Sequence, residues 1–289
     1  MISILIPLYN YNVSNLLDEL NLLLSKQSIT YEIIILDDAS PKPPKLKSYK
    51  NTILLRNETN LGRLKARQFL AKKANYNWLL FLDADVIPKN KDFITTYVEA
   101  TKTENDVFFG GFSYHNTVPI RDYRLRYYYG KTKEQVEARI RNTNPYKVII
   151  SGNFLIKKNL FLDLDFDLKN GYGLDNYFGA LLKENNIKVK HLNNEVYHLG
   201  LEKSANYLEK KEAAAKTLLH LYKTNPHIKH DNDLLKRFIQ VEKLKLTFIC
   251  SWFFLVFKSA LKQNLTGKKP SIFLLQIYRL AFMCYKFRN

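Results

Sequence analysis

Two aspartates separated by one residue, Asp83 and Asp85 with Ala84 between them, directly follow the apolar segment 78–82. Ligands of α/β proteins bind beyond the carboxyl ends of the sheet strands, where these side chains would lie. Carboxylate oxygens suit Mg²⁺ or Mn²⁺, and such an ion can bridge the oxygens of a diphosphate. Because the same spacing is also common in turns, other residues must decide whether it marks a metal site.

Three further polar segments occur where apolar segments end or a helical pattern begins. Residues 7–10 (Pro-Leu-Tyr-Asn) follow the apolar residues 2–6, and residues 37–41 (Asp-Asp-Ala-Ser-Pro) follow residues 33–36. Residues 60–63 (Asn-Leu-Gly-Arg) lead into a helical pattern. Since parallel strands end at the same edge of a sheet, these segments and the aspartate pair are expected to line one site.

This succession resembles the family 2 inverting glycosyltransferases of the GT-A fold, whose strands lead in the same order to Pro-x-Tyr-Asn, Asp-Asp-x-Ser, Asn-x-Gly and Asp-x-Asp. The resemblance covers about the first 200 residues. It implies metal-dependent transfer of a sugar from a nucleotide-sugar donor, most commonly a uridine diphosphate sugar, with Mn²⁺ or Mg²⁺ as cofactor. It implies these positions: Pro7, Tyr9, Asn10 and Asp38 at the nucleoside with Asp37 nearby, Arg63 or Lys65 at the diphosphate, and Asp83, Ala84 and Asp85 at the ribose and metal.

An inverting transfer also needs a general base that takes the proton of the acceptor hydroxyl. Family members supply it from a Glu-Asp pair at a helix start, and in residues 171–179 (Gly-Tyr-Gly-Leu-Asp-Asn-Tyr-Phe-Gly) this pair is not intact. Alignment on Phe-Gly places Asp175 at the Asp and Leu174 at the Glu; alignment on the two earlier glycines places Asp175 at the Glu and Asn176 at the Asp. Asp175 is therefore the predicted base, with a helix cap as the alternative interpretation.

Two further segments in the second half of the chain resemble family positions. His198 resembles a histidine that some GT-A enzymes add to the metal shell, and neutral imidazole suits Mn²⁺ better than Mg²⁺. A single histidine is more often structural. Gly152 and Asn153, after Ser151, resemble the small-residue segment beneath the donor sugar.

Alternating apolar and helical segments predict an α/β fold with a mainly parallel central sheet flanked by helices, in agreement with GT-A, and a helical C-terminal extension. The predicted organisation is a nucleotide-sugar-binding half (1–110), an acceptor-binding half of the same domain (111–202), and a helical, basic and aromatic region (203–289). Expected strands are residues 2–6, 33–36, 53–55, 78–82, 107–109, 188–191 and 196–200. Expected helices are a segment capped by Ser14, and residues 61–73, 133–141 and 175–184.

The chain has 289 residues, 46% of them hydrophobic, and a formal net charge of +18 that requires an anionic partner or surface. We find no zinc-ligand set, basic zipper or ribonucleoprotein motif, so nucleic acid is not an expected partner. Cys250 and Cys284 are too few for a disulfide framework and fit a reducing, cytoplasmic compartment. Residues 1–7 are interpreted as a first strand, not as a signal peptide.

The charge is concentrated after Glu242, where nine lysines and arginines and no acidic residue occur among many aromatic side chains. The apolar segment 246–257 is too short to span a bilayer, which needs about 20 helical residues. Its composition is typical of a helix bound to an anionic membrane surface, and a cap packed on the domain is the alternative. We therefore expect a peripheral protein on the inner face of the cytoplasmic membrane, with a glycan or lipid-linked saccharide as acceptor.

Two other functions remain open at this point. A nucleotidyltransferase also combines an α/β sheet with paired aspartates, but it usually has a glycine-rich loop after its first strand, and residues 7–13 contain no glycine. A non-catalytic sugar or nucleotide binder of the same fold remains possible because the Glu-Asp pair is altered.

Overall fold

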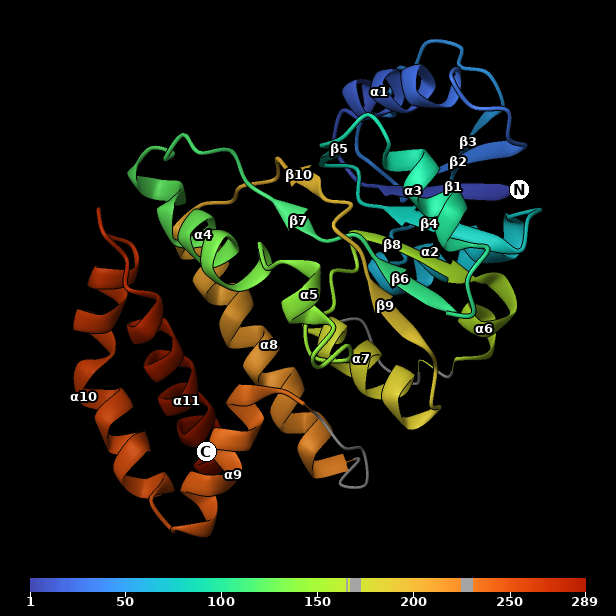
Figure 1. Ribbon diagram of the computed structural model, residues 1–289. Helices are drawn as coiled ribbons and strands as arrows, with labels where there is room; N and C mark the ends of the chain where they lie inside the picture. The colour runs from blue at the N-terminus through green and yellow to red at the C-terminus, as the bar shows by residue number, and fades with distance from the viewer. Residues whose placement is uncertain (165, 167–172, 225–230) are drawn as a thin grey trace.

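The computed structural model describes residues 1–164, 166, 173–224 and 231–289 (Figure 1). The strands are β1 (Ile2–Leu8), β2 (Tyr31–Asp37), β3 (Thr52–Arg56), β4 (Trp78–Leu82), β5 (Val86–Pro88), β6 (Val107–Phe109), β7 (Phe112–Ser113), β8 (Asn153–Lys157), β9 (Val189–His191) and β10 (Val196–His198). The α-helices are α1 (Ser14–Leu24), α2 (Arg63–Lys73), α3 (Phe93–Ala100), α4 (Arg124–Tyr129), α5 (Ala138–Arg141), α6 (Lys158–Asp163), α7 (Leu174–Glu184), α8 (Ser204–Thr224), α9 (Asp233–Lys243), α10 (Thr247–Leu265) and α11 (Ile272–Arg288).

A seven-stranded sheet of order β3-β2-β1-β4-β8-β6-β9 forms the centre of the fold. Strands β1 to β4 are mutually parallel where they pair, so their carboxyl ends share one edge. Strand β8 runs antiparallel to β4 and pairs its first residue, Asn153, with Leu82 at the end of β4. The reversal of β8 therefore brings residues 151–153 to the edge at which Asp83 and Asp85 lie.

Helices cover both faces of this sheet. On one face α1 and α3 pack with side chains such as Ile4 and Ile33, and on the other α2, α6 and α7 pack with Leu5 and Ile34. Because both faces of β1, β2 and β4 are buried, these strands lack polar alternation, as expected for a covered parallel sheet. The fold class predicted from the sequence is confirmed.

A second, three-stranded sheet of order β5-β10-β7 lies beside the edge of the large sheet (Figure 1). Strand β10 pairs antiparallel with β5, and this register sets His198 opposite Val86. This pairing places a histidine from late in the chain next to the segment that carries Asp85.

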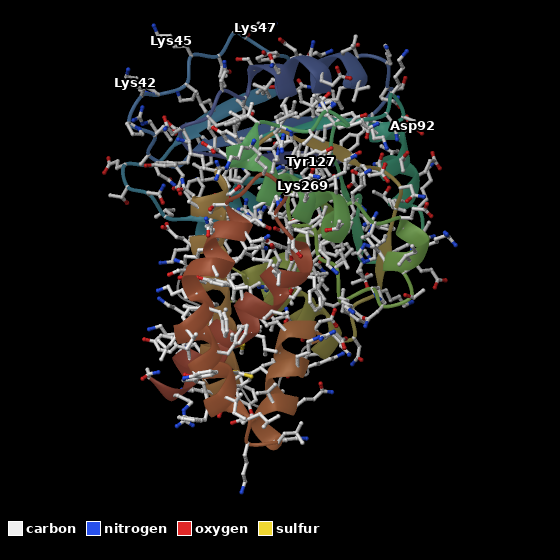
Figure 2. All side chains as sticks on the ribbon, turned by 90° about the vertical axis from the view of Figure 1, so that its left-hand side faces the viewer. Lys42, Lys45, Lys47, Asp92, Tyr127 and Lys269 are labelled. Carbon is white, nitrogen blue, oxygen red and sulfur yellow. The ribbon has the colours of Figure 1, made fainter. Side chains whose placement is uncertain are left out.

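The last four helices form a separate apolar cluster, in which α10 and α11 pack as a hairpin and α8 connects them to the sheets (Figure 1). Figure 2 shows this hairpin from its outer side, with Lys269 at the end near Tyr127. Among the residues described, no single helix is long and apolar enough to cross a membrane; α9 and α10 meet this test only as a pair, bent by 117°.

Two local predictions were wrong. The first helix begins at Ser14 itself, and Asn12 Oδ1 accepts a hydrogen bond from the Ser14 amide at 3.0 Å, so Ser14 is not the capping residue. The expected helix 133–141 is interrupted at Gln135, between a π-helical turn (Gly130–Glu134) and α5. The side chain of Gln135 accepts a hydrogen bond from the Tyr114 amide, which favours the break in helical geometry.

Candidate active site

One large cavity, of about 1680 Å³, collects most of the residues that the sequence singled out for chemistry. Its lining includes Arg63, Asp83, Asp85, Asp175 and His198. These residues come from α2, the end of β4, the start of α7 and the end of β10, so the fold joins segments more than 100 residues apart in the sequence. The predicted metal, diphosphate and base positions therefore belong to one site.

Asp83 is buried and bound by two arginines of α2. Its Oδ2 accepts from Arg63 Nη2 at 2.9 Å, and its Oδ1 accepts from Arg67 Nη2 at 2.7 Å. Burial acts to raise the pKa of Asp83, but the two guanidinium charges outweigh it and lower the pKa. Gly152 lies against the same carboxylate, since a Cβ there would be 2.7 Å from Asp83 Oδ2. Asp83 is thus an ionised carboxylate with both oxygens in use.

Arg67 connects this carboxylate to the rest of the site. Its Nη2 also donates to the Ser151 carbonyl at 2.6 Å, which ties α2 to the turn before β8. Burial lowers the pKa of Arg67, while the negative charges of Asp83 and Asp175 oppose that shift. Asp175 therefore lies within electrostatic reach of Arg67, in the first turn of α7.

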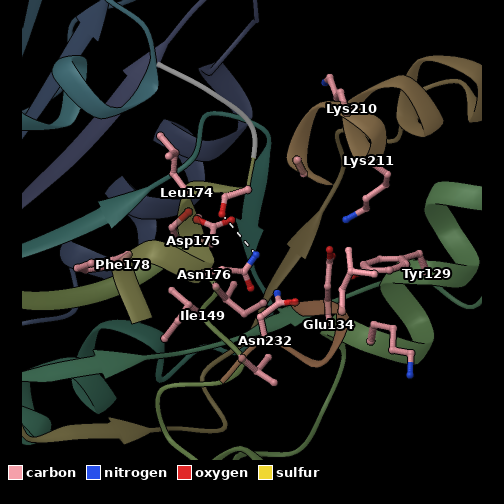
Figure 3. Close-up of a pocket in the computed structure, with 18 of the residues that line it drawn as sticks. Tyr129, Glu134, Ile149, Leu174, Asp175, Asn176, Phe178, Lys210, Lys211 and Asn232 are labelled. Atoms are coloured by element: carbon pink, nitrogen blue, oxygen red, sulfur yellow. Dashed lines mark hydrogen bonds between the residues drawn. The ribbon is translucent and has the colours of Figure 1, made fainter. Parts of the chain in front are cut away.

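The helix that carries Asp175, α7, begins at Leu174, within the segment that the resemblance predicts to hold the catalytic base. Leu174 and Asn176 flank Asp175, and the Asn176 side-chain amide donates to the Gly173 carbonyl at 3.4 Å (Figure 3). Gly171, on which one of the two alignments depends, lies outside the described residues. Asp175 remains the predicted base, and Figure 3 shows it at the cavity wall with Leu174 and Asn176.

Asp85 and His198 face each other, with Asp85 Oδ2 3.7 Å from His198 Nε2. Carboxylate oxygen and imidazole nitrogen are ligands of Mn²⁺, and Mg²⁺ or Mn²⁺ usually combines one or two protein ligands with substrate phosphate oxygens. This pair fits such a site. Within the described parts of the chain, no group of three or more His, Cys, Asp or Glu side chains is placed to bind a metal by itself.

The surroundings of His198 favour its neutral form, the form that can bind a metal. Burial lowers its pKa, and so does the nearby positive charge of Arg126, against the opposing effect of Asp85. Its ring lies against Phe112 and Tyr114, at centroid distances of 4.9 and 5.8 Å. His198 Nδ1 is buried, and no hydrogen-bond partner for it occurs among the residues that the structure places.

The residues predicted at the nucleoside lie at the ends of β1 and β2. Asp38 binds the loop before α2, accepting from the Asn57 side chain and from the amides of Leu61 and Gly62 at 2.8–2.9 Å. Asp37 is buried, accepts from the Ser40 amide at 3.0 Å and lies 3.6 Å from Arg56 Nε. Both carboxylates shape the loops at this edge, and their predicted contact with a nucleoside stays a prediction.

The residues at the end of β1 are more open to solvent. Tyr9 is exposed, Pro7 is half-buried, and Asn10 has a positive φ of 47° and donates its amide to Ser40 Oγ at 2.7 Å. Asn10 and Tyr11 line a smaller cavity of about 330 Å³. Burial and the charge of Asp85 raise the pKa of Tyr11, so Tyr11 lies within electrostatic reach of Asp85.

Three predicted donor residues lie differently from the others. Lys65 is exposed on α2, outside the described lining of the large cavity. Asn153 is fully buried, accepts from Tyr97 Oη at 2.6 Å and donates to the carbonyls of Gly111 and Asn194. The side-chain amide of Asn153 thus makes its hydrogen bonds within the protein. Ala84 is half-buried between the two aspartates.

Several residues of the site were not predicted from the sequence. Arg67 lies one helical turn after Arg63 and shares its face of α2, a spacing that could have indicated a second partner for Asp83. Arg126, Glu134 and Lys211 line the cavity from the aromatic and basic stretch and from α8. Only their packing against the site distinguishes them from other charged residues.

The sequence model of Glycosyl transferase family 2 matches residues 3–164, more than half of the chain. An uncharacterized glycosyltransferase of Haemophilus influenzae is 32% identical over 114 residues, which cover 37% of this chain and only 38% of that protein. Among solved structures, the mannosyltransferase PcManGT from Pyrobaculum calidifontis, described in complex with GDP-Man and Mn²⁺, is similar with a TM-score of 0.56 and 13% identity, over 100% of this chain and 86% of that chain.

A structure of S. aureus TarS in complex with UDP-GlcNAc is similar with a TM-score of 0.47 and 18% identity, over 99% of this chain and 91% of that chain. The family match covers the sheet edge with Asp38, Arg63, Asp83 and Asp85. The chain therefore belongs to glycosyl transferase family 2 and has the GT-A fold.

Proposed function

We propose that this member of glycosyl transferase family 2 is a glycosyltransferase that takes its sugar from a nucleoside diphosphate sugar, in a single, inverting displacement that depends on Mn²⁺ or Mg²⁺. The observation that carries the proposal is the convergence of Asp85, His198 and Asp175 on one cavity. It is supported by the fold shared with PcManGT, which is described with GDP-Man and Mn²⁺.

In this proposal the ends of β1 and β2 contact the nucleoside, and Arg63 is near the diphosphate. Asp85 and His198 are the residues that would bind the metal, because Asp83 already uses both carboxylate oxygens for Arg63 and Arg67. A bound divalent ion neutralises the negative charge that develops on a departing diphosphate. Lys65 is the weaker candidate for the diphosphate because it is exposed outside the cavity lining.

Asp175 is proposed as the general base. Its carboxylate lines the cavity together with Gly152, which is expected to lie beneath the donor sugar. The carboxylate accepts the proton of the acceptor hydroxyl while the oxygen attacks the anomeric carbon, so the sugar leaves the diphosphate with inverted configuration. Arg67 lies near both Asp83 and Asp175 and so connects the proposed base electrostatically with the end of β4.

The test is calorimetric titration of uridine diphosphate, with and without Mn²⁺, together with sugar transfer from UDP-sugars to water or saccharides. We expect Mn²⁺-dependent binding in wild type and Asp175→Asn and its loss in Asp85→Ala. Transfer should fall by about 10²–10⁴ in Asp175→Asn, the range for loss of a general base. Retained transfer in Asp175→Asn would refute the assignment of the base, and wild-type binding without turnover would favour a non-catalytic binder. The same titrations with guanosine and thymidine diphosphates identify the nucleotide that the protein binds.

We further propose that the protein works at the cytoplasmic face of an anionic membrane, bound through the outer face of α10. Phe248, Ile249, Trp252, Leu255 and Val256 lie on that face at helical spacing and are 52–61% exposed. Aromatic and aliphatic side chains on one helix face, bordered by lysines, match a helix that lies in the membrane interface.

The charges around this face support an anionic surface as the partner. Lys243, Lys245 and Lys258 are exposed at or near the ends of α10, and Arg288 places its guanidinium 5.3 Å from the Phe248 ring. Lysine and arginine near a membrane each contribute about 1 kcal/mol with acidic lipids. Cys250 and Cys284 are both free thiols, which supports the reducing side of the membrane.

Sedimentation with vesicles of phosphatidylglycerol and phosphatidylcholine tests this proposal. Phe248→Ser and Trp252→Ser should each weaken binding by about tenfold, from the apolar area no longer buried in lipid. Leu22→Ser, which removes an equally exposed apolar side chain from α1, is the matched control and should bind like wild type. Equal recovery of all variants would show that the face of α10 is not the contact.

A further inference from the structure

One part of the cavity wall carries more positive than negative charge and is not used by the proposed chemistry. It is formed by Arg126 of α4, Lys211 of α8 and Arg279 of α11, here termed the basic wall. Glu134 is the acidic side chain placed among them. Figure 3 shows Lys211 extending into the cavity toward Glu134 and Tyr129, whereas the neighbouring Lys210 points away.

Glu134 is already paired. Its Oε2 accepts from Arg126 Nη1 at 2.9 Å and also from the Tyr114 hydroxyl. Burial acts to raise the pKa of Glu134, but Arg126 and then Lys211 outweigh it and lower the pKa. Glu134 is thus a carboxylate that pairs with Arg126 and also interacts with Lys211, so one negative charge is shared among the three cations of the wall.

Lys211 and Arg279 are both half-buried, and neither forms an ion pair with a carboxylate in the segments that the structure describes. The Lys211 ammonium lies over the rings of Tyr129 and Tyr207, at 4.0 and 4.8 Å from their centroids, and in the described part of the chain it forms no ion pair. Arg279 Nη1 donates to Gln276 at 3.0 Å, while its buried Nε has no acceptor among the residues described. Lys210, by contrast, pairs with Glu202 at 2.7 Å.

These like charges repel one another. Burial lowers the pKa of Lys211, and the positive charges of Arg279 and Arg126 add to this shift, whereas Tyr129 and Glu134 oppose it. Three cations and one carboxylate leave a charge of +2 (3 − 1) on this wall. Holding such charges together in an enclosed site costs free energy that an anionic ligand would offset, so the arrangement is expected at a binding site.

We propose that the basic wall binds a phosphate group of the acceptor, which makes the acceptor a phosphate-bearing saccharide. The inference rests on the proposed transferase function. A phosphate dianion matches the +2 charge of the wall. Lys211 and Arg279 lie outside the family match of residues 3–164, as expected for acceptor contacts that vary between members. Ile277 and Phe273 of α11 line the same cavity, so it continues toward the hairpin proposed to contact lipid.

The test measures binding of inorganic phosphate, without metal, by ³¹P line broadening and calorimetry, and binding of uridine diphosphate with Mn²⁺ in parallel. Lys211→Met and Arg279→Gln should each raise the Kd for phosphate by about 10–100-fold, the range for a lost charged hydrogen bond. Lys211→Arg should retain most of the affinity. Lys203→Met, which removes an exposed charge just before α8, is the control and should match wild type.

Three results would overturn the inference. If wild-type protein does not bind phosphate, the proposed phosphate site does not exist. If both charge-removing variants bind phosphate with unchanged affinity, phosphate binds elsewhere on the protein. A parallel loss of uridine diphosphate affinity in Lys211→Met and Arg279→Gln would assign the wall to the donor diphosphate. Because neither measurement uses turnover, such results leave the transferase proposal intact. Thermal unfolding of each variant separates loss of binding from loss of folding.

Discussion

Substituting Gly200 by alanine tests the proposed metal end of the cavity without altering either ligand. A Cβ at residue 200 would lie 1.7 Å from Asp85 Oδ2 and 2.7 Å from Asp85 Cγ. A carbon–oxygen contact needs about 3.3 Å, so the carboxylate must move by about 1.6 Å. Gly200 does not have the positive φ that would itself require glycine. The Asp85 side chain can rotate, so we expect a folding cost below about 1 kcal/mol.

The displaced carboxylate would no longer face His198, from which its Oδ2 is now 3.7 Å. A misplacement of about 1 Å at a reactive site can cost about 100-fold. Gly200→Ala should therefore lower Mn²⁺-dependent affinity for uridine diphosphate by about 10–100-fold, in calorimetry, with nearly unchanged thermal unfolding. Leu199→Ala, in the same segment, is the control. Unchanged metal-dependent affinity in Gly200→Ala would refute the assignment of Asp85 as a ligand.

Further predictions concern the buried charges that shape the site. Arg67→Met should lower the free energy of unfolding by about 3–5 kcal/mol in urea titration, because it leaves Asp83 buried with one arginine. The same loss in Arg63→Gln, which changes the exposed arginine partner of Asp83, would contradict this prediction. Burial lowers the pKa of His191 to about 4 in the folded protein. Between about pH 4 and 6.5 the unfolded chain therefore binds more protons than the folded protein. The free energy of unfolding rises with pH in this range, by at most about 3 kcal/mol. His191→Gln should lack that part of the pH dependence, and an unchanged profile would contradict it. Asp38→Ala removes three hydrogen bonds and should lower the free energy of unfolding by about 3 kcal/mol. It should also increase proteolysis of the loop 57–62. A variant as resistant to protease as wild type would contradict this prediction.

The sequence predicts the first half of the fold well because the local signals agree with the tertiary structure there. Continuous apolar segments bounded by Pro7, Asp37 and Asp83 occur only where strands are buried on both faces, and all of them are strands in the structure. The interruption at Gln135 was missed because it depends on a hydrogen bond to Tyr114, which no local pattern of residues 130–141 contains. The helical periodicity of a segment contains no information about a hydrogen-bond partner outside that segment.

The candidate site was predicted in part for a similar reason. Strand ends indicate which residues share an edge of the sheet, so Asp83 and Asp85 could be placed together with Arg63. The approach of His198 depends on the pairing of β10 with β5, between residues more than 100 positions apart, and only the family resemblance pointed to it. The basic wall was not predicted at all, because the positions of Lys211 and Arg279 depend on how α8 and α11 pack against α4.

The two aspartates of the Asp-Ala-Asp segment have different electrostatic surroundings, and this difference determines which of them can serve a metal. Asp83 lies inside the protein with both oxygens bound by guanidinium groups, so recruiting it would break a buried ion pair, at a cost of about 3–5 kcal/mol. Asp85 is more exposed and faces a neutral histidine, so its charge remains uncompensated until a cation arrives. Asp83 then acts through Arg67, which links it to the Ser151 carbonyl and lies near Asp175. In the proposed mechanism, the first aspartate thus positions the acceptor side of the site, and the second is left to bind the metal.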